Sequence, residues 1–480
     1  MIFNSLDFAL FLPIVFILYW FVTQKSLTAQ NILLLVASYF FYAFWDPRFL
    51  LLLMFSTFLD YFTGLRMFDA KTIQWKKFWF WLSIIVNVGF LGVFKYYNFF
   101  AESFASMLEG FGMHVEVWTL QIILPVGISF YTFHGLSYVI DIYKDRIKPE
   151  RNFVDYAVFV SFFPLLVAGP IERATHLLPQ IQKKRVFDYR KAIDGMRQIL
   201  WGLFKKVVVA DGCAEWANMI FNDADAYSGS TLLMGAIFFT FQIYCDFSGY
   251  SDIALGTARL FGIELLRNFA FPYFSRDIAE FWRRWHISLS SWFRDYLYIP
   301  LGGSKGGLGM KIRNTFIIFV VSGFWHGANW TFIVWGALNA LYFMPLLLTK
   351  SNRTNLEIVA QGKWFPTIRE IVGMVLTFLM AVFGWIFFRA KDMEHALTFI
   401  KGIFSKNLWK APNLPELADL TIFFILFMVF IEWIGRESKY ALENIDKVRF
   451  APARWLFYTA LIVCIIVLSG KEQEFIYFQF

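Results

Sequence analysis

Two short stretches place ionisable side chains inside an otherwise apolar chain. The first, FWRRWHISLSSWFRDYLYIP (281–300), carries His286 among arginines and aromatic residues. The second, SGFWHGANW (322–330), sets His326 between two strongly apolar runs. An imidazole has an unperturbed pKa near ~6.5 and exchanges protons at neutral pH. An ionisable side chain within a membrane faces the protein interior or water and is a candidate functional group.

Each histidine also has a structural explanation. Residues 278–300 predict a helix broken before Pro300, either lying at a membrane interface or lining a polar passage with one face. His326 either serves chemistry or hydrogen-bonds a neighbouring carbonyl and holds helices together. Its flanking glycines allow close backbone approach or a local break, and Asn329 is placed to hydrogen-bond the ring if the segment is helical. The residues alone leave these alternatives open.

Other motifs are weaker. No histidine or cysteine stands three or four residues after His286, so no tetrahedral metal site is predicted, and no cofactor-binding residue is identified. The stretch LGGSKGGLGM (301–310) lacks the spacing of a phosphate-binding loop. The remaining histidines are interpreted as packed, interfacial or solvated: His114, His134, His176 and His395.

Composition indicates a polytopic membrane protein. The 480 residues are 58% hydrophobic and 17% charged, whereas soluble domains average about 25% charged residues. Several apolar runs reach the ~20 residues that span a bilayer. The net charge of +8 is assigned to cytoplasmic loops, so a nucleic-acid partner is not predicted. The apolar start, MIFNSLDFALFLPIVFILYWFV, lacks a basic region and a cleavage site and is expected to be the first span.

About ten to twelve membrane crossings are expected within one domain covering residues 1–480. The candidate spans are 6–22, 31–45, 49–65, 78–94, 119–142, 230–245, 314–324, 329–348, 369–388, 418–434 and 454–469. Shorter or interrupted apolar pieces lie at 153–170, 199–210 and 252–263.

Basic loops predict an irregular segment in the first half. With the N-terminus outside, Lys25 and the loops 66–77 and 144–151 fall inside, as the positive-inside rule requires. The basic run QKKRVFDYRK, which ends at Lys191, should also be inside, yet only the piece 153–170 precedes it. We therefore expect this piece to be re-entrant or interfacial and kinked near Pro164. Non-helical backbone at that depth must be buried in protein or line a cavity.

The two histidine stretches, read together with four other blocks, resemble the membrane-bound O-acyltransferase family. The other blocks are FNSLDFALFLPIVFILYW, ILPVGISFYTFHGLSYVIDIYKD, FFPLLVAGPIER and YCDFSGYSDIALG. They are most similar to the bacterial branch that contains the membrane subunits of alginate O-acetylation, which is related to the teichoic acid D-alanylation proteins. The resemblance runs to about residue 350, and the remainder matches only in hydropathy.

The resemblance implies an all-α ring of tilted helices, with re-entrant and interfacial pieces, around a central passage. It implies that His326 is catalytic and that His286 is the second, upstream site residue. It also implies a multi-pass protein of the bacterial inner membrane that moves an acetyl or acyl group from a cytoplasmic thioester to an envelope or extracellular polysaccharide. The donor would be acetyl-CoA or an acyl carrier protein, with no tightly bound cofactor. The expected partners are an extracytoplasmic SGNH-type acetyltransferase, the polysaccharide acceptor and membrane lipid.

Two readings compete with the enzyme. A transporter or flippase of a lipid-linked sugar or an anion would also need internal polar residues and broken helices. A structural scaffold for a polysaccharide complex would keep its function without His326. The acceptor and the donor are not determined by the sequence.

Overall fold

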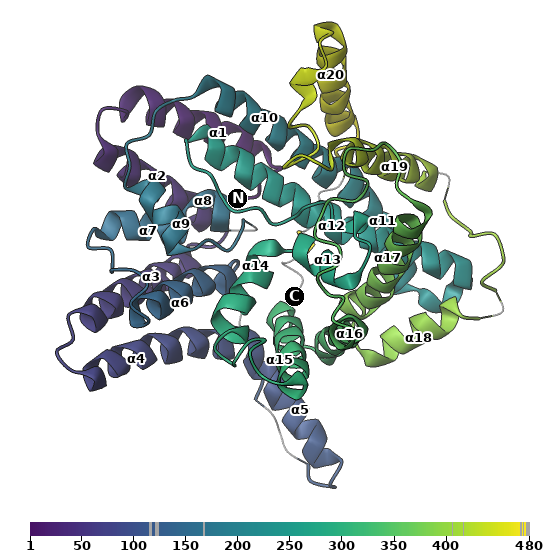
Figure 1. Cartoon of the computed structure of the whole chain (residues 1–480), viewed down its shortest axis with the longest axis horizontal. Helices are drawn as coiled ribbons and strands as arrows, with labels where there is room; N and C mark the ends of the chain where they lie inside the picture. The colour runs from purple at the N-terminus through teal and green to yellow at the C-terminus, as the bar shows by residue number, and fades with distance from the viewer. Residues whose placement is uncertain are drawn as a thin grey trace. The chain divides into compact units, whose positions relative to one another are not determined.

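The computed structural model describes residues 1–114, 118–120, 124–166, 169–405, 407–415, 417–470, 473 and 475–476. Across these residues the chain is helical, with no strand, which confirms the all-α prediction (Figure 1). Contacts group the chain into two compact units. Unit 1 comprises residues 1–192 and 257–266, and unit 2 comprises residues 193–256 and 267–480.

Unit 1 is built from α-helices that are joined in part by hydrogen bonds between buried polar side chains. Helices α3, α4 and α6 lie side by side (Figure 1), and Asp60 of α3 accepts hydrogen bonds from Ser83 and Asn87 of α4. Gly135 of α6 leaves the room that the Asp60 carboxylate occupies. The helices are α1 (Leu6–Ile17), α2 (Leu27–Ala43), α3 (Pro47–Phe68), α4 (Ile73–Leu91), α5 (Tyr97–Glu109), α6 (Ile128–Tyr143), α7 (Phe153–Ser161), α8 (Phe163–Leu166) and α9 (Ala174–Ile181), with π-helical turns η1 (Leu18–Val22) and η2 (Gly92–Tyr96).

Unit 2 holds both candidate histidines. Helices α10 (Tyr189–Leu203) and α12 (Gly229–Leu260) contribute residues to both units. The other helices of unit 2 are α11 (Asp211–Asn222), α13 (Ile278–Arg284), α14 (Ile287–Phe293), α15 (Leu308–His326), α16 (Trp330–Leu348), α17 (Ile368–Arg389), α18 (Met393–Ile403), α19 (Ala418–Gly435) and α20 (Ala451–Val467). The π-helical segments are η3 (Phe204–Ala210) and η6 (Arg294–Tyr298), and the 3₁₀ turns are η4 (Ala224–Ala226), η5 (Pro272–Phe274) and η7 (Ile445–Lys447).

Side-chain caps start many of these helices where the sequence supplies a short polar residue. Each such side chain accepts a hydrogen bond from a backbone N–H of the first turn, which has no partner within the helix. Thr367 and Glu370 form a reciprocal capping box at the start of α17. The other capping residues are Ser5, Ser26, Asp46, Thr72, Asn152, Asp277, Asn329 and Asp392.

Within the described residues, six helices are long and apolar enough to cross a membrane, in agreement with the polytopic prediction. They are 47–68, 73–109, 229–260, 330–348, 368–389 and 418–435, and shorter apolar helices lie at 6–22, 27–43 and 451–467. Large apolar side chains on their outer faces are exposed, as lipid contact requires; Leu6 of α1 is 84% exposed and Phe21 of η1 is 71% exposed.

Several predicted boundaries are wrong. The piece 230–245 and residues 252–260 of the next piece belong to one helix, α12. The polar residues between them, Asp246, Ser248 and Ser251, are buried and continue the helix instead of forming a loop. The span 314–324 is the second half of the longer α15, which begins among basic residues. The span 119–142 begins as a helix only at Ile128, and its residues 121–123 lie outside the described part of the chain.

The predicted interruption within 153–170 is confirmed. Helix α7 ends at Ser161, and its nine residues extend only about 14 Å, far less than the ~30 Å of a bilayer core. The backbone leaves the helical conformation at Phe162, and a new helix, α8, begins at Phe163. Pro164 lies in the first turn of α8, where a proline is tolerated because its missing N–H would have no partner within the helix. Residues 155–166 are all buried, so the irregular backbone is covered by protein. Residues 167–168 of this piece lie outside the described chain.

Candidate active site

His326 is the last residue of α15 and is 4% exposed. Gly323, one turn earlier, lies against the backbone carbonyl of Phe332 in α16, a position that a larger side chain would clash with. Gly327 takes an extended conformation and ends the helix. Both predicted roles of the flanking glycines, close approach and a local break, are therefore confirmed.

The Asn329 side chain bonds to backbone groups instead of the His326 ring. Its side-chain oxygen caps α16 by accepting from the Thr331 N–H, and its Nδ2 donates to the Lys391 carbonyl. The predicted hydrogen bond to the imidazole required a helix that continues through residue 329, and α15 ends at His326.

His286 lies at a helix break that the sequence placed too late. The predicted helix over 278–300 is divided at Trp285 and His286 into α13 and α14. His286 has a left-handed backbone, with φ of +43° and ψ of +54°. This conformation costs about 1–3 kcal/mol for a residue other than glycine and persists only where surrounding contacts enforce it.

Residues 268–270, here called the brace, supply those contacts. The Asn268 carbonyl accepts from the Ile287 N–H at 2.9 Å, and the Ala270 N–H donates to the Arg284 carbonyl at 3.0 Å. These bonds satisfy backbone groups on both sides of His286 that a continuous helix would otherwise pair.

The Asn268 side chain extends the brace to two more elements. Its Oδ1 accepts from the Ser288 hydroxyl at 2.6 Å, and its Nδ2 donates to the Ser251 hydroxyl of α12 at 3.0 Å. All three side chains are buried. A buried amide with both ends hydrogen-bonded fixes the position of the turn that carries His286.

The two candidate histidines come together although they are forty residues apart. Their ring centroids lie 6.4 Å apart with the planes at 58°. Aromatic rings from four helices surround them: Phe247 of α12 lies 4.7 Å from His286, and Trp325, Trp335 and Phe388 lie 4.9, 5.3 and 5.2 Å from His326. Charge interactions are stronger inside an apolar enclosure than in water.

His286 is 1% exposed and lies outside the helices that could span a membrane. Its burial lowers the pKa of the imidazole to about 3. The ring is therefore neutral at physiological pH and is suited to donate or accept a hydrogen bond, not to supply a positive charge.

The neighbouring arginines hold structure together. Arg283 donates to the carbonyls of Asn352 and Asn355, and Arg284 pairs with the buried Glu280 at 2.8 Å. Arg294 pairs with the adjacent Asp295 at 2.8 Å. Arg283 and Arg284 thus secure α13 beside His286, whereas the pair of Arg294 and Asp295 joins adjacent, partly exposed residues.

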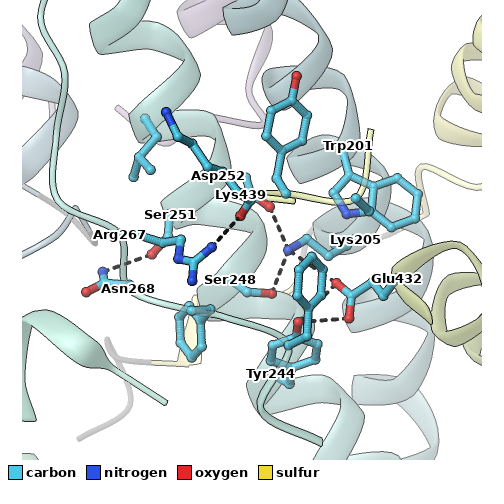
Figure 2. A pocket seen from close by; sticks show the side chains of 15 residues that line it. Trp201, Lys205, Tyr244, Ser248, Ser251, Asp252, Arg267, Asn268, Glu432 and Lys439 are labelled. Atoms are coloured by element: carbon cyan, nitrogen blue, oxygen red, sulfur yellow. Dashed lines mark hydrogen bonds and ion pairs between the residues drawn. The ribbon is translucent and has the colours of Figure 1, made fainter. Parts of the chain in front are cut away.

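A second buried cluster escaped the sequence reasoning. Figure 2 shows the Lys205 amine from η3 between Asp252 of α12, at 2.7 Å, and Glu432 of α19, at 3.9 Å. The Lys205 amine also donates to Ser248, and the Tyr244 hydroxyl donates to Glu432. The cluster borders a cavity of about 20 Å³, which is room for about one water molecule. Two lysines in the apolar run 199–210 were the available signal, since charges in such a run need buried partners.

The adjacent Lys206 connects this region to the C-terminal segment. Its amine pairs with Asp211 and Asp246 and donates to the Gln473 carbonyl. The Ile476 N–H donates to Asp246 at 2.7 Å. The Phe475 ring lies 6.3 Å from Phe247, the aromatic neighbour of His286. The end of the described chain therefore packs beside the candidate site, which the hydropathy pattern did not predict.

Comparisons with known proteins place both histidines within a region shared with one family. Residues 144–383, which include both histidines, match the model of the membrane-bound O-acyltransferase family. The chain is 40% identical over 423 residues to the probable alginate O-acetylase AlgI of Pseudomonas aeruginosa, covering 88% of this chain and 78% of that protein. It is 37% identical to the peptidoglycan O-acetyltransferase of Helicobacter pylori, covering 83% and 78%. It is 28% identical to the teichoic acid D-alanyltransferase of Bacillus subtilis, covering 56% and 70%.

The chain belongs to the membrane-bound O-acyltransferase family. It is a multi-pass membrane protein and an O-acyltransferase. The individual roles of His326 and His286 remain predictions.

Proposed function

We propose that this O-acyltransferase moves an acetyl group from a cytoplasmic thioester, across the inner membrane, toward the hydroxyl groups of an envelope or extracellular polysaccharide. Three relatives, named for alginate, peptidoglycan and teichoic acid, support an envelope polymer as the acceptor. The observation that carries the proposal is the meeting of His286 and His326 inside one aromatic enclosure.

His326 acts as general base in this proposal. Its imidazole takes the proton from the attacking hydroxyl as the oxygen bonds to the acetyl carbon. The carbon–sulfur bond then breaks, and the proton passes to the leaving thiolate. The ring sits at the C-terminal end of α15, where the helix dipole favours the imidazolium that forms in this step. Neutral His286 orients the acceptor or hydrogen-bonds the developing oxyanion.

The donor is acetyl-CoA or an acetylated carrier protein. An extracytoplasmic SGNH-type acetyltransferase then moves the acetyl group from the hydroxyl acetylated at His326 to a hydroxyl of the polymer. A transporter or flippase, the other class that the sequence left open, would move its cargo without forming an ester bond and does not fit the O-acyltransferase family to which the chain belongs.

The test is transfer of radiolabelled acetate to the polymer by membranes that contain His326→Ala. We expect a loss of about 10²–10⁴-fold, the usual contribution of a positioned general base. His114→Ala is the matched control, because His114 is exposed and remote in sequence from both motifs. Wild-type labelling by a correctly inserted His326→Ala protein would contradict the assignment.

A further inference from the structure

A cavity of about 860 Å³ opens at the far end of α15 from His326. Four cationic residues line it: Arg294, Lys311, Lys350 and Arg353. Among the described residues, Lys311, Lys350 and Arg353 form no ion pair with a carboxylate. Three positive charges at one concave site without acidic partners indicate an anionic ligand.

The same cavity has an apolar wall. It is formed by α15 and α16, through Ile318, Phe319, Phe343, Leu347 and Leu348. Helix α16 is apolar enough to cross a membrane, so part of this wall belongs to a membrane-spanning element. A ligand that matches both sides has a charged head and an apolar tail.

The cationic side is pre-formed by anchored loops. Arg283 holds the loop after α16 through the carbonyls of Asn352 and Asn355. On the opposite side, buried Asn314 donates to the carbonyls of Leu301 and Gly303 and fixes the loop that precedes α15. The cavity therefore keeps its form without depending on contacts made by its four cations.

The start of α15 adds a further attraction for negative charge. Gly306, Gly307 and Leu308 line the cavity, and the N-cap residue Gly307 offers no side-chain acceptor to the first-turn N–H groups. These groups and the helix dipole favour a phosphate oxygen at this end of the helix.

We propose that this cavity binds the phosphate headgroup of an anionic phospholipid, with its acyl chains along α15 and α16. Basic pockets between membrane helices bind such headgroups, and these pockets lie on the cytoplasmic side of the membrane. Phosphate chemistry is shared with soluble phosphate esters, but the apolar wall favours the lipid. The site is separate from the histidine pair and does not depend on the acyl-transfer mechanism.

Native mass spectrometry of the purified, delipidated full-length chain tests the proposal. The probes are phosphatidylglycerol, zwitterionic phosphatidylcholine and coenzyme A. We expect phosphatidylglycerol to bind the wild type more tightly than phosphatidylcholine, and Lys350→Gln/Arg353→Gln to weaken phosphatidylglycerol about tenfold or more. Lys311→Gln alone should weaken it less. Phosphatidylcholine affinity should not change.

The double variant Lys391→Gln/Lys401→Gln is the matched control, since it removes the same charge from exposed residues that do not line this cavity. It should bind phosphatidylglycerol as the wild type does. Equal phosphatidylglycerol affinity of the cavity variant and the control would overturn the proposal. Loss of coenzyme A binding with unchanged phosphatidylglycerol binding would also overturn it, because the cavity would then serve a soluble phosphate ester.

Discussion

His286 combines an unusual backbone with a buried ring, and substitutions can separate the two. Glycine adopts the left-handed region freely, whereas alanine does not. We expect His286→Gly to keep the turn but lower kcat by about 10²–10³-fold, the cost of losing one oxyanion donor. His286→Ala should lose comparable activity and also unfold at lower temperature. The acetate-transfer assay and thermal unfolding in detergent measure these effects, and unchanged kcat in His286→Gly would exclude a role for the ring.

His176 of unit 1 predicts a pH-dependent contribution to stability. Its Nδ1 lies 2.8 Å from the buried Glu172 carboxylate, and this hydrogen bond raises the pKa of His176, which lies outside the candidate spans. A histidine whose folded pKa exceeds its unfolded value stabilises the fold below ~6.5 and loses that contribution as pH rises through the folded pKa. The melting temperature of the wild type should therefore exceed that of His176→Gln most at acidic pH. A difference that is constant with pH would contradict the predicted linkage.

For single residues, the sequence identifies as functional candidates those whose type is unusual among their neighbours in the chain. His326 and His286 stand out because each interrupts apolar or aromatic residues. Asn268 does not stand out, because its importance comes from bonds to Ser251 and Ser288, on elements whose proximity only the folded chain reveals. The resemblance to the family located the histidine pair, and only the structure identified what holds it.

The packing of η3, α12 and α19 depends on buried charges that neutralise one another. Lys205 is 3% exposed and faces Asp252 and Glu432. Removing one partner of a buried ionic group leaves the others uncompensated, at a cost of about 3–5 kcal/mol. We expect Lys205→Met to lower the free energy of unfolding by this amount and to reduce the yield of folded protein.

A second substitution tests whether the loss is electrostatic. Lys205→Met/Glu432→Gln removes one of the two uncompensated carboxylates and should be more stable than Lys205→Met alone. Lys401→Met, at an exposed position of α18, should change stability by less than about 0.5 kcal/mol. Denaturant titration in mixed micelles gives all three values. If the double variant were no more stable than the single one, lost packing instead of lost charge would explain the effect.

The ends of helices could be predicted where hydropathy changes abruptly along the chain. They could not be predicted where tertiary contacts determine whether a helix breaks or continues. The helices near 49–65 and 329–348 match α3 and α16 closely, since apolar runs end at polar caps. The break at His286 depends on the brace, and the continuity of α12 depends on buried partners for Asp246 and Asp252. Neither feature leaves a local signature in the chain.

In each unit, buried polar side chains bond to one another, while large apolar side chains of the candidate spans are exposed. The buried carboxylates of the described residues include Asp60, Asp246, Glu280 and Glu432, each bonded to side chains of its own unit. This distribution is what a bilayer requires, because lipid offers no partner for a charge. Basic residues outside these clusters then indicate, through the positive-inside rule, which helix ends face the cytoplasm.

The hairpin of α15 and α16 carries a testable orientation. Lys305, Lys311 and Arg313 stand at the start of α15, while Lys350 and Arg353 follow α16. The positive-inside rule places both ends in the cytoplasm. His326 is then about 27 Å further along α15, toward the opposite side of the membrane. A thioester from the cytoplasm and a hydroxyl from outside would approach the histidine pair from different directions.

Cysteine labelling decides this orientation. In a Cys464→Ser background, where Cys213 and Cys245 are buried, Ser351→Cys should react with an impermeant maleimide only in inside-out vesicles. Lys391→Cys, which follows the next helix and is exposed, should react only in intact spheroplasts. Both variants must support wild-type acetate transfer, so that labelling reports the functional form. Labelling of both positions from one side would mean that α17 does not cross the membrane, and reaction of Ser351→Cys from outside would place the cationic cavity opposite the cytoplasmic leaflet.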